Sequence, residues 1–156
     1  MPKTSTCLWF DTQAKEAADL YVGLFPNARI TATTHYGKGM PGPEGSVLTV
    51  TFEIDGHEYT LLNGGKHFTL SPAVSIVVHC ESQEEIDRYW SALSAVPQAE
   101  QCGWLVDRFG VSWQIVPRQL IRLIGDANPA RAKRAFDAMM QMKKIDVAAI
   151  EAARRG

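Results

Sequence analysis

The stretch CLWFDTQAKEAADLYVGLFPNARI, residues 7–30, contains the pattern from which the fold can be derived. It begins inside the apolar run Thr6–Phe10, which is short and aromatic, as expected for a buried strand. Over residues 12–25 apolar side chains recur every three or four positions, with Thr12 as N-cap and Pro26 as stop signal. A strand followed at once by an amphipathic helix predicts an α+β unit in which the helix covers one face of a sheet.

Further strands complete this unit. Residues 29–36 alternate in polarity, and the Gly- and Pro-rich run 37–45 is a loop. Val47–Ile54 and residues 58–62 are rich in strand formers and are joined by Asp55-Gly56, the dipeptide typical of a type I′ hairpin turn. Residues 6–62 therefore read βαβββ.

The same order of elements recurs after a linker. Ser82 and Glu85 are spaced as a capping box, which marks the start of the second helix. Strands are expected at residues 73–80, 98–102, 104–108 and 111–116, with the helix at residues 82–95. We therefore expect a single domain, residues 1–156, that consists of module one (about 5–65), a linker (about 66–72), module two (about 73–117) and C-terminal helices (about 118–155).

The C-terminal segment is predicted to be helical. Asn128 followed by Pro129 suits an N-cap and the first helical position, because Pro has no N–H to leave unpaired there. Met139, Met140 and Met142 form an apolar stripe, interpreted as a cover over the sheet or as a dimer contact.

Composition excludes several classes of protein. The 156 residues are 46% hydrophobic and 21% charged, with a formal net charge of −1, so no field attracts nucleic acid. No apolar run approaches the roughly 20 residues of a bilayer span, and no signal peptide is evident, so we expect a cytoplasmic protein without a membrane partner. The three cysteines are widely separated, which is typical of reduced thiols rather than a disulfide framework.

Two turns are distinctive. Asp107-Arg108 before Gly110 is interpreted as fixing a turn rather than as an acid–base pair. Asn63-Gly64-Gly65 is a place where the backbone can approach a ligand closely, because glycine has no side chain to obstruct it.

Three runs resemble one protein family. Residues 7–30, the run CGWLVDRFGVSWQIVPRQL (102–120) and the tail MMQMKKIDVAAIEAA (139–153) are similar to PhnB-like, or "3-demethylubiquinone 3-methyltransferase domain", proteins of the vicinal-oxygen-chelate (glyoxalase/bleomycin-resistance/dioxygenase) superfamily. The resemblance implies two βαβββ modules whose sheets curl into a cup around a pocket, usually in a homodimer.

The resemblance also identifies the positions of metal ligands in metal-using relatives. They fall here on Thr6, Asn63 (or Leu62, since the alignment can slip by one), Ser75 and Gln114. None is the imidazole or carboxylate that such divalent metals prefer. We therefore expect no tightly bound metal and no other cofactor, with a divalent metal as the alternative.

Strand alternation predicts the pocket wall. In the last strand Trp113 and Ile115 should pack under a helix, so that Gln114 faces the cup. An amide there can donate and accept hydrogen bonds toward a ligand, or it can only bridge buried water. The predicted ligand-pocket residues are Thr6, Leu8, Phe10, Asn63, Ser75, His79, Trp104 and Gln114, and no catalytic residue is assigned.

These residues favour a metal-independent protein that binds a small molecule, with or without catalysis. One alternative is a glyoxalase- or dioxygenase-type metalloenzyme that uses other ligands, such as His67 or His79 with Glu53 or Glu58. Another is a drug-sequestering resistance protein. The methyltransferase name is unsupported, because no GxGxxG-like turn follows a strand of a doubly wound sheet.

Overall fold

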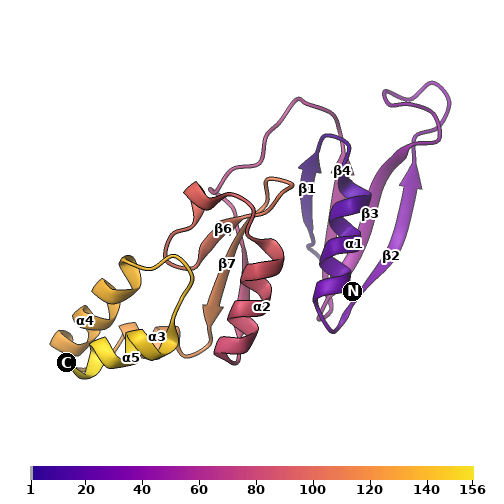
Figure 1. Cartoon of the computed structure of the whole chain (residues 1–156). Helices are drawn as coiled ribbons and strands as arrows, with labels where there is room; N and C mark the ends of the chain where they lie inside the picture. The colour runs from indigo at the N-terminus through magenta and orange to yellow at the C-terminus, as the bar shows by residue number, and fades with distance from the viewer. Residues whose placement is uncertain (1) are drawn as a thin grey trace. The chain divides into compact units, whose positions relative to one another are not determined.

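The computed structural model describes residues 2–156 and divides into two compact units, Met1–Leu70 and Ser71–Gly156. The boundary falls within the predicted linker. Each unit contains one small sheet with a helix against it (Figure 1).

The first unit has the predicted βαβββ order. Its four strands pair in the order β1-β4-β3-β2, with β1 parallel to β4 and the other pairs antiparallel. Asp55 and Gly56 both have positive φ (49° and 79°), as a type I′ turn requires. The elements are β1 (Thr6–Phe10), α1 (Ala14–Leu24), β2 (Ala28–His35), β3 (Val47–Ile54) and β4 (His57–Asn63).

Helix α1 covers one face of this sheet. Ala14, Ala17, Ala18 and Tyr21 are fully buried, and the Tyr21 ring lies 6.0 Å from that of Phe52 on β3. The helix begins one residue later than predicted, because its N-cap is Gln13 instead of Thr12. The small alanines bring the helix close to the strands, and the aromatic pair fills the core between them.

The second unit has one strand fewer than predicted. Residues 98–102 do not form a strand, because Pro97 begins the short 3₁₀ helix η1 (Pro97–Ala99) and the positive φ of Cys102 and Gly103 reverses the chain. Only Gln101 retains a single bridge, to Trp104. The elements are β5 (Ile76–Cys80), α2 (Gln83–Leu93), η1, β6 (Trp104–Val106) and β7 (Ser112–Pro117), and the sheet order is β5-β7-β6.

Helix α2 starts at the predicted capping box. The Ser82 hydroxyl accepts a hydrogen bond from the Glu85 backbone N–H (3.2 Å), while the Glu85 carboxylate accepts from the Glu81 N–H (2.9 Å). The buried side of α2, Ile86 and Leu93 among it, lies on the face of the sheet that carries Trp113 and Ile115. The prediction that these two strand residues pack under a helix is confirmed.

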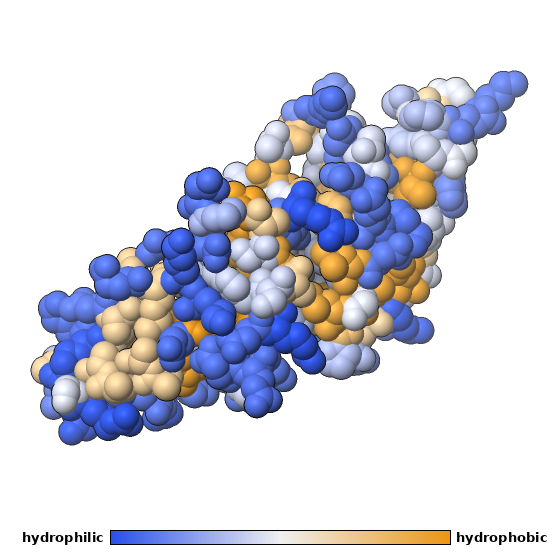
Figure 2. Space-filling view, in the orientation of Figure 1, coloured by the Kyte–Doolittle hydropathy of each residue, from blue (hydrophilic) through white to orange (hydrophobic). Residues whose placement is uncertain are grey.

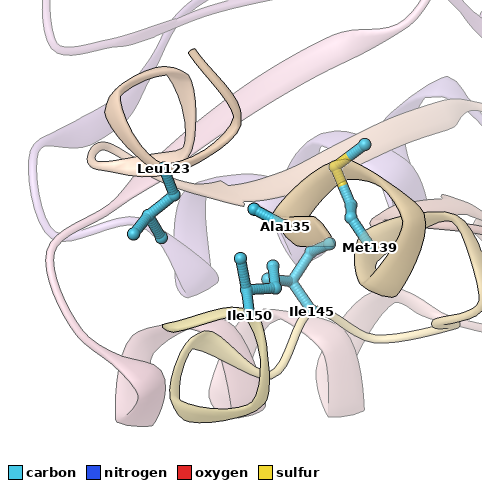
Figure 3. Close-up of a cluster of buried hydrophobic side chains, with 5 residues drawn as sticks. All are labelled: Leu123, Ala135, Met139, Ile145 and Ile150. Atoms are coloured by element: carbon cyan, nitrogen blue, oxygen red, sulfur yellow. The ribbon is translucent and has the colours of Figure 1, made fainter. Parts of the chain in front are cut away.

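The C-terminal helices have a core of their own (Figure 3). They are α3 (Leu120–Ile124), α4 (Pro129–Met140) and α5 (Val147–Arg155), and Asn128 caps α4 as predicted. Met139 packs with Leu123, Ala135, Ile145 and Ile150, so this methionine belongs to a helical cluster rather than to a cover over the sheet. Figure 2 shows pale apolar areas framed by hydrophilic residues over these helices.

Backbone contacts attach this cluster to the second sheet. The N–H groups of Cys102 and Gly103 donate to the carbonyls of Met142 (2.7 Å) and Lys143 (2.8 Å). The tail therefore satisfies the backbone where the expected strand is missing. Within residues 2–156, no helix combines the length and apolar character needed to cross a bilayer.

Candidate functional site

Four of the predicted pocket residues come together on the second sheet. The Gln114 amide donates to the Ser75 hydroxyl (3.0 Å), and Trp104 is the strand partner of Gln114. Ser75, Val77 and His79 follow one another at two-residue steps, so their side chains point to the same face. Val77 pairs with Gln114, and His79 pairs with Val116. These side chains lie on the face opposite α2, and the prediction that Ser75 and Gln114 share one surface is confirmed.

A further polar group on this face was not singled out from the sequence. Ser112 is only 3% exposed, and its hydroxyl has no hydrogen-bond partner among residues 2–156. Strand parity places it beside Gln114 on the same face. Because a buried hydroxyl without a partner costs free energy, this position has an unused capacity to bind a polar group.

The other four predicted residues lie on the helix-covered face of the first sheet. Leu8 and Phe10 are 7% and 5% exposed, and they pair with Leu61 and Asn63, whose side chains face α1. Thr6 has the same parity and contacts His57 (3.2 Å). The structure therefore does not bring Thr6, Leu8 and Phe10 onto an open face.

Asn63 supports the backbone around it. Its Oδ1 accepts from the Ala14 N–H at the start of α1 (2.9 Å), and its Nδ2 donates to the Val47 carbonyl (3.1 Å). The Asn63 carbonyl accepts from the Tyr36 hydroxyl (2.5 Å). One side chain thus ties together β4, α1 and β3.

The open face of the first sheet carries other residues. Trp9 pairs with Leu62, and Thr51 and Thr60 share a hydrogen bond (3.0 Å) on the same face. Leu62, the alternative ligand position, therefore lies on the open face, whereas Asn63 does not. The sequence missed Trp9 because both faces of β1 are apolar.

A cavity of about 500 Å³ lies in the first unit, where β1 and β4 end and the 37–45 loop begins. The start of α1 provides mostly polar groups, and the loop provides apolar ones. The cavity is lined by Asp11, Thr12, Lys15, Tyr36, Pro41, Gly42, Pro43, Ser46, Val47, Asn63, Gly64, Gly65 and His67. Asn63 is the one predicted pocket residue in this lining.

Gly64 and Gly65, which line this cavity, are each required for a different structural reason. A Cβ on Gly64 would lie 2.2 Å from the Trp9 ring, so this glycine makes room for the indole rather than for a ligand. Gly65 has φ +90°, and its carbonyl accepts from the Trp9 Nε1–H (2.8 Å). Backbone–ligand contact at Asn63-Gly64-Gly65 remains a prediction.

Within the part of the chain that the structure describes, residues 2–156, no three His, Cys, Asp or Glu side chains gather as potential metal ligands. Burial raises the pKa of the Cys7 thiol, and burial together with nearby Glu85 raises that of Cys80 to about 12. Neither thiol is activated as a nucleophile.

Asp107 holds the turn before β7, as the sequence predicts. Its carboxylate accepts from the N–H groups of Phe109 (2.9 Å) and Val111 (3.0 Å) and from the Trp113 indole (2.9 Å). The residue is 2% exposed, so its function is to order the turn and the core.

Comparison with known proteins gives the family. The model of the 3-demethylubiquinone-9 3-methyltransferase family matches residues 2–116. A solved PhnB protein from Bacillus cereus is 34% identical, with a TM-score of 0.64, over 74% of this chain and 99% of that one. Protein PA1353 from Pseudomonas aeruginosa is 18% identical, with a TM-score of 0.58, over 75% of this chain and 98% of that one. The search of curated proteins gave no match.

The match to residues 2–116 includes both sheets except for the last residue of β7 and excludes all three C-terminal helices. Together with the α+β fold of two small sheets, each with its own helix, it confirms the resemblance found in the sequence. The chain belongs to the 3-demethylubiquinone-9 3-methyltransferase family, the PhnB-like group of the vicinal-oxygen-chelate superfamily.

Proposed function

We propose that this protein binds a small organic molecule in the cavity of the first unit, without a bound metal. The cavity carries this proposal, because about 500 Å³ lies within the range of small-molecule sites. Its lining has the usual composition of such sites, apolar walls with a few polar groups.

Ligand-dependent stabilisation tests the proposal. A metabolite and drug library is screened by thermal shift, because a ligand that binds only the folded state raises the melting temperature by mass action. Thr12→Trp adds a bulky ring at the cavity, and Thr4→Trp makes the same change at an exposed position outside the lining. Shifts that survive Thr12→Trp would place the ligand elsewhere, whereas loss in Thr12→Trp alone supports the cavity.

The open face of the second sheet is proposed as a second ligand-binding surface, formed by Ser75, His79, Trp104 and Gln114. The Gln114 amide and the Ser75 hydroxyl, which meet on this face (3.0 Å), support this proposal. Gln114→Leu should remove the binding of any ligand that uses the face, whereas Gln98→Leu, the same change at an exposed residue, should not. Equal binding by both variants would contradict it.

Metal independence is tested by elemental analysis of protein purified without metal and then soaked in zinc, nickel or manganese. Stoichiometric metal that resists dialysis would overturn this part of the proposal. The drug-sequestering alternative is separated by the same thermal-shift screen, since failure with every hydrophobic drug would count against it.

A methyltransferase reaction of the common kind is not part of the proposal. Such enzymes bind their cofactor at a glycine-rich turn between strand and helix. The three strand-to-helix turns of residues 2–156, at residues 11–13, 81–82 and 118–119, contain no glycine.

We also propose that the protein is a cytoplasmic homodimer. Support comes from the family and from exposed apolar residues such as Val77 (40% exposed) on the open face of the second sheet. Sedimentation velocity at micromolar concentration should show twice the mass of one chain, and a monomer would contradict the dimer.

A further inference from the structure

The charges around the cavity of the first unit are unequally compensated. Lys15 is paired, because its ammonium group lies 2.6 Å and 2.7 Å from the two carboxylate oxygens of Asp19. Asp11, an exposed residue of the same lining, has no ion pair or side-chain hydrogen bond among residues 2–156. The carboxylate of Asp11 therefore carries a negative charge that no ion pair of the described residues balances.

The start of helix α1 offsets this charge only in part. Asn63 Oδ1 already accepts from the Ala14 N–H, and Glu16 places a second carboxylate in the first turn, near the partial positive charge of the helix N-terminus. Neither of these groups involves the Asp11 carboxylate. This exposed carboxylate therefore has no cationic partner among residues 2–156, and a cationic group of a ligand can supply one.

The rest of the lining is suited to an apolar body. Pro41, Pro43 and Val47 present hydrocarbon surface, and the Tyr36 hydroxyl is engaged with the Asn63 carbonyl. Thr12 and His67 provide polar atoms near the start of α1. A molecule with one positively charged end and one apolar end satisfies both sides of the cavity.

We infer that the cavity takes a small organic amine, with its ammonium group at Asp11 and its apolar part against Pro41, Pro43 and Val47. This inference rests on the proposed function, and it adds the chemical class of the ligand. An ammonium–carboxylate contact is a charge-assisted hydrogen bond, which is stronger than a neutral one. The cavity should therefore bind a cationic ligand more tightly than a neutral or an anionic ligand of the same shape.

Three probes of one shape test the class. Benzylamine, benzyl alcohol and benzoate share a ring and differ in charge, and each is titrated at constant ionic strength while the amide signals of Gly42, Gly64 and Gly65 are followed by NMR. Benzylamine should shift these signals with an affinity about two- to fivefold higher than that of benzyl alcohol, because water screens an ion pair with an exposed carboxylate and leaves only a modest gain. Benzoate should bind most weakly.

Asp11→Asn keeps the shape and removes the charge, so the affinity for benzylamine should fall about two- to fivefold, to the level of benzyl alcohol. Asp55→Asn is the matched control, since it makes the same change in the hairpin turn outside the lining, and it should leave all three affinities unchanged.

Equal or tighter binding of benzoate, a preference for amine that persists in Asp11→Asn, or no shift with any probe would overturn the inference. If the library screen still finds a neutral or anionic ligand that Thr12→Trp abolishes, the proposed function stands and only the amine class falls. Absence of any ligand sensitive to Thr12→Trp removes both.

Discussion

At the scale of single residues, two glycines with opposite surroundings give a matched pair. A Cβ on Gly64 would lie 2.2 Å from the Trp9 ring, whereas nothing lies within 4 Å of a Cβ on Gly23 in α1. Gly64→Ala should lower the free energy of unfolding by about 1–3 kcal/mol, because the indole must move and break its hydrogen bond to Gly65. Gly23→Ala should raise it by up to about 1 kcal/mol. Urea denaturation measures both, and equal effects would contradict the packing described for Trp9.

The carboxylate of Asp107 gives a second prediction at this scale. Asp107→Ala removes the acceptor for two turn amides and the Trp113 indole, so the free energy of unfolding should fall by about 2–4 kcal/mol. Asp107→Asn retains one carbonyl oxygen for the turn amides, so its loss should be smaller. If the two variants are equally stable in urea, the turn does not depend on these bonds.

At the scale of elements, Gln83 in α2 makes two hydrogen bonds to the C-terminal segment, beside the ion pair between Asp87 and Lys144 (2.8 Å). Gln83 donates to the Ile145 carbonyl (2.9 Å) and accepts from the Val147 N–H (2.9 Å) at the start of α5. Gln83→Ala should lower stability by about 1–3 kcal/mol and speed hydrogen exchange in α5, because two partly buried backbone groups lose their partner. Gln98→Ala, at an exposed position, is the control. Unchanged exchange in α5 would show that the segment is held by other contacts.

At the scale of the whole molecule, Cys80 makes stability depend on alkaline pH. Burial raises the folded-state pKa of this thiol from 9.0 to about 12. Between these values the unfolded chain releases a proton that the folded protein retains, so stability should fall as pH rises above about 9. Urea midpoints from pH 8 to pH 10.5 should decline less steeply in Cys80→Ala than in the native protein. A native slope that is no steeper than that of the variant would contradict the burial effect.

Thiol labelling examines the two units separately, since Cys7 lies in the first and Cys80 in the second. At pH 8, Cys80 should stay unlabelled until the second unit unfolds, because it is buried and protonated. Labelling of Cys80 at the rate of a free thiol in native buffer would contradict this expectation.

Local sequence determined most elements of this protein. Period-two alternation, Asp55-Gly56, the Ser82 capping box and the Asn128-Pro129 pair each act over a few residues, and the structure contains all of them. In β7 the bulky Trp113 and Ile115 also identified the face that the helix covers, which left Gln114 on the open side. The prediction of a strand at residues 98–102 was wrong, because the backbone at the end of this run bonds to the distant segment at Met142 and Lys143.

Only the tertiary structure decided which face of β1 is open and where the cavity lies. Alternation groups residues into two faces but does not say which one a helix will cover, and in β1 both Leu8 with Phe10 and Cys7 with Trp9 are apolar. The position of α1 against β3 and β4 made that choice and buried Leu8, Phe10 and Asn63. The cavity joins the start of α1, the 37–45 loop and the end of β4, so it exists only once distant segments have packed together.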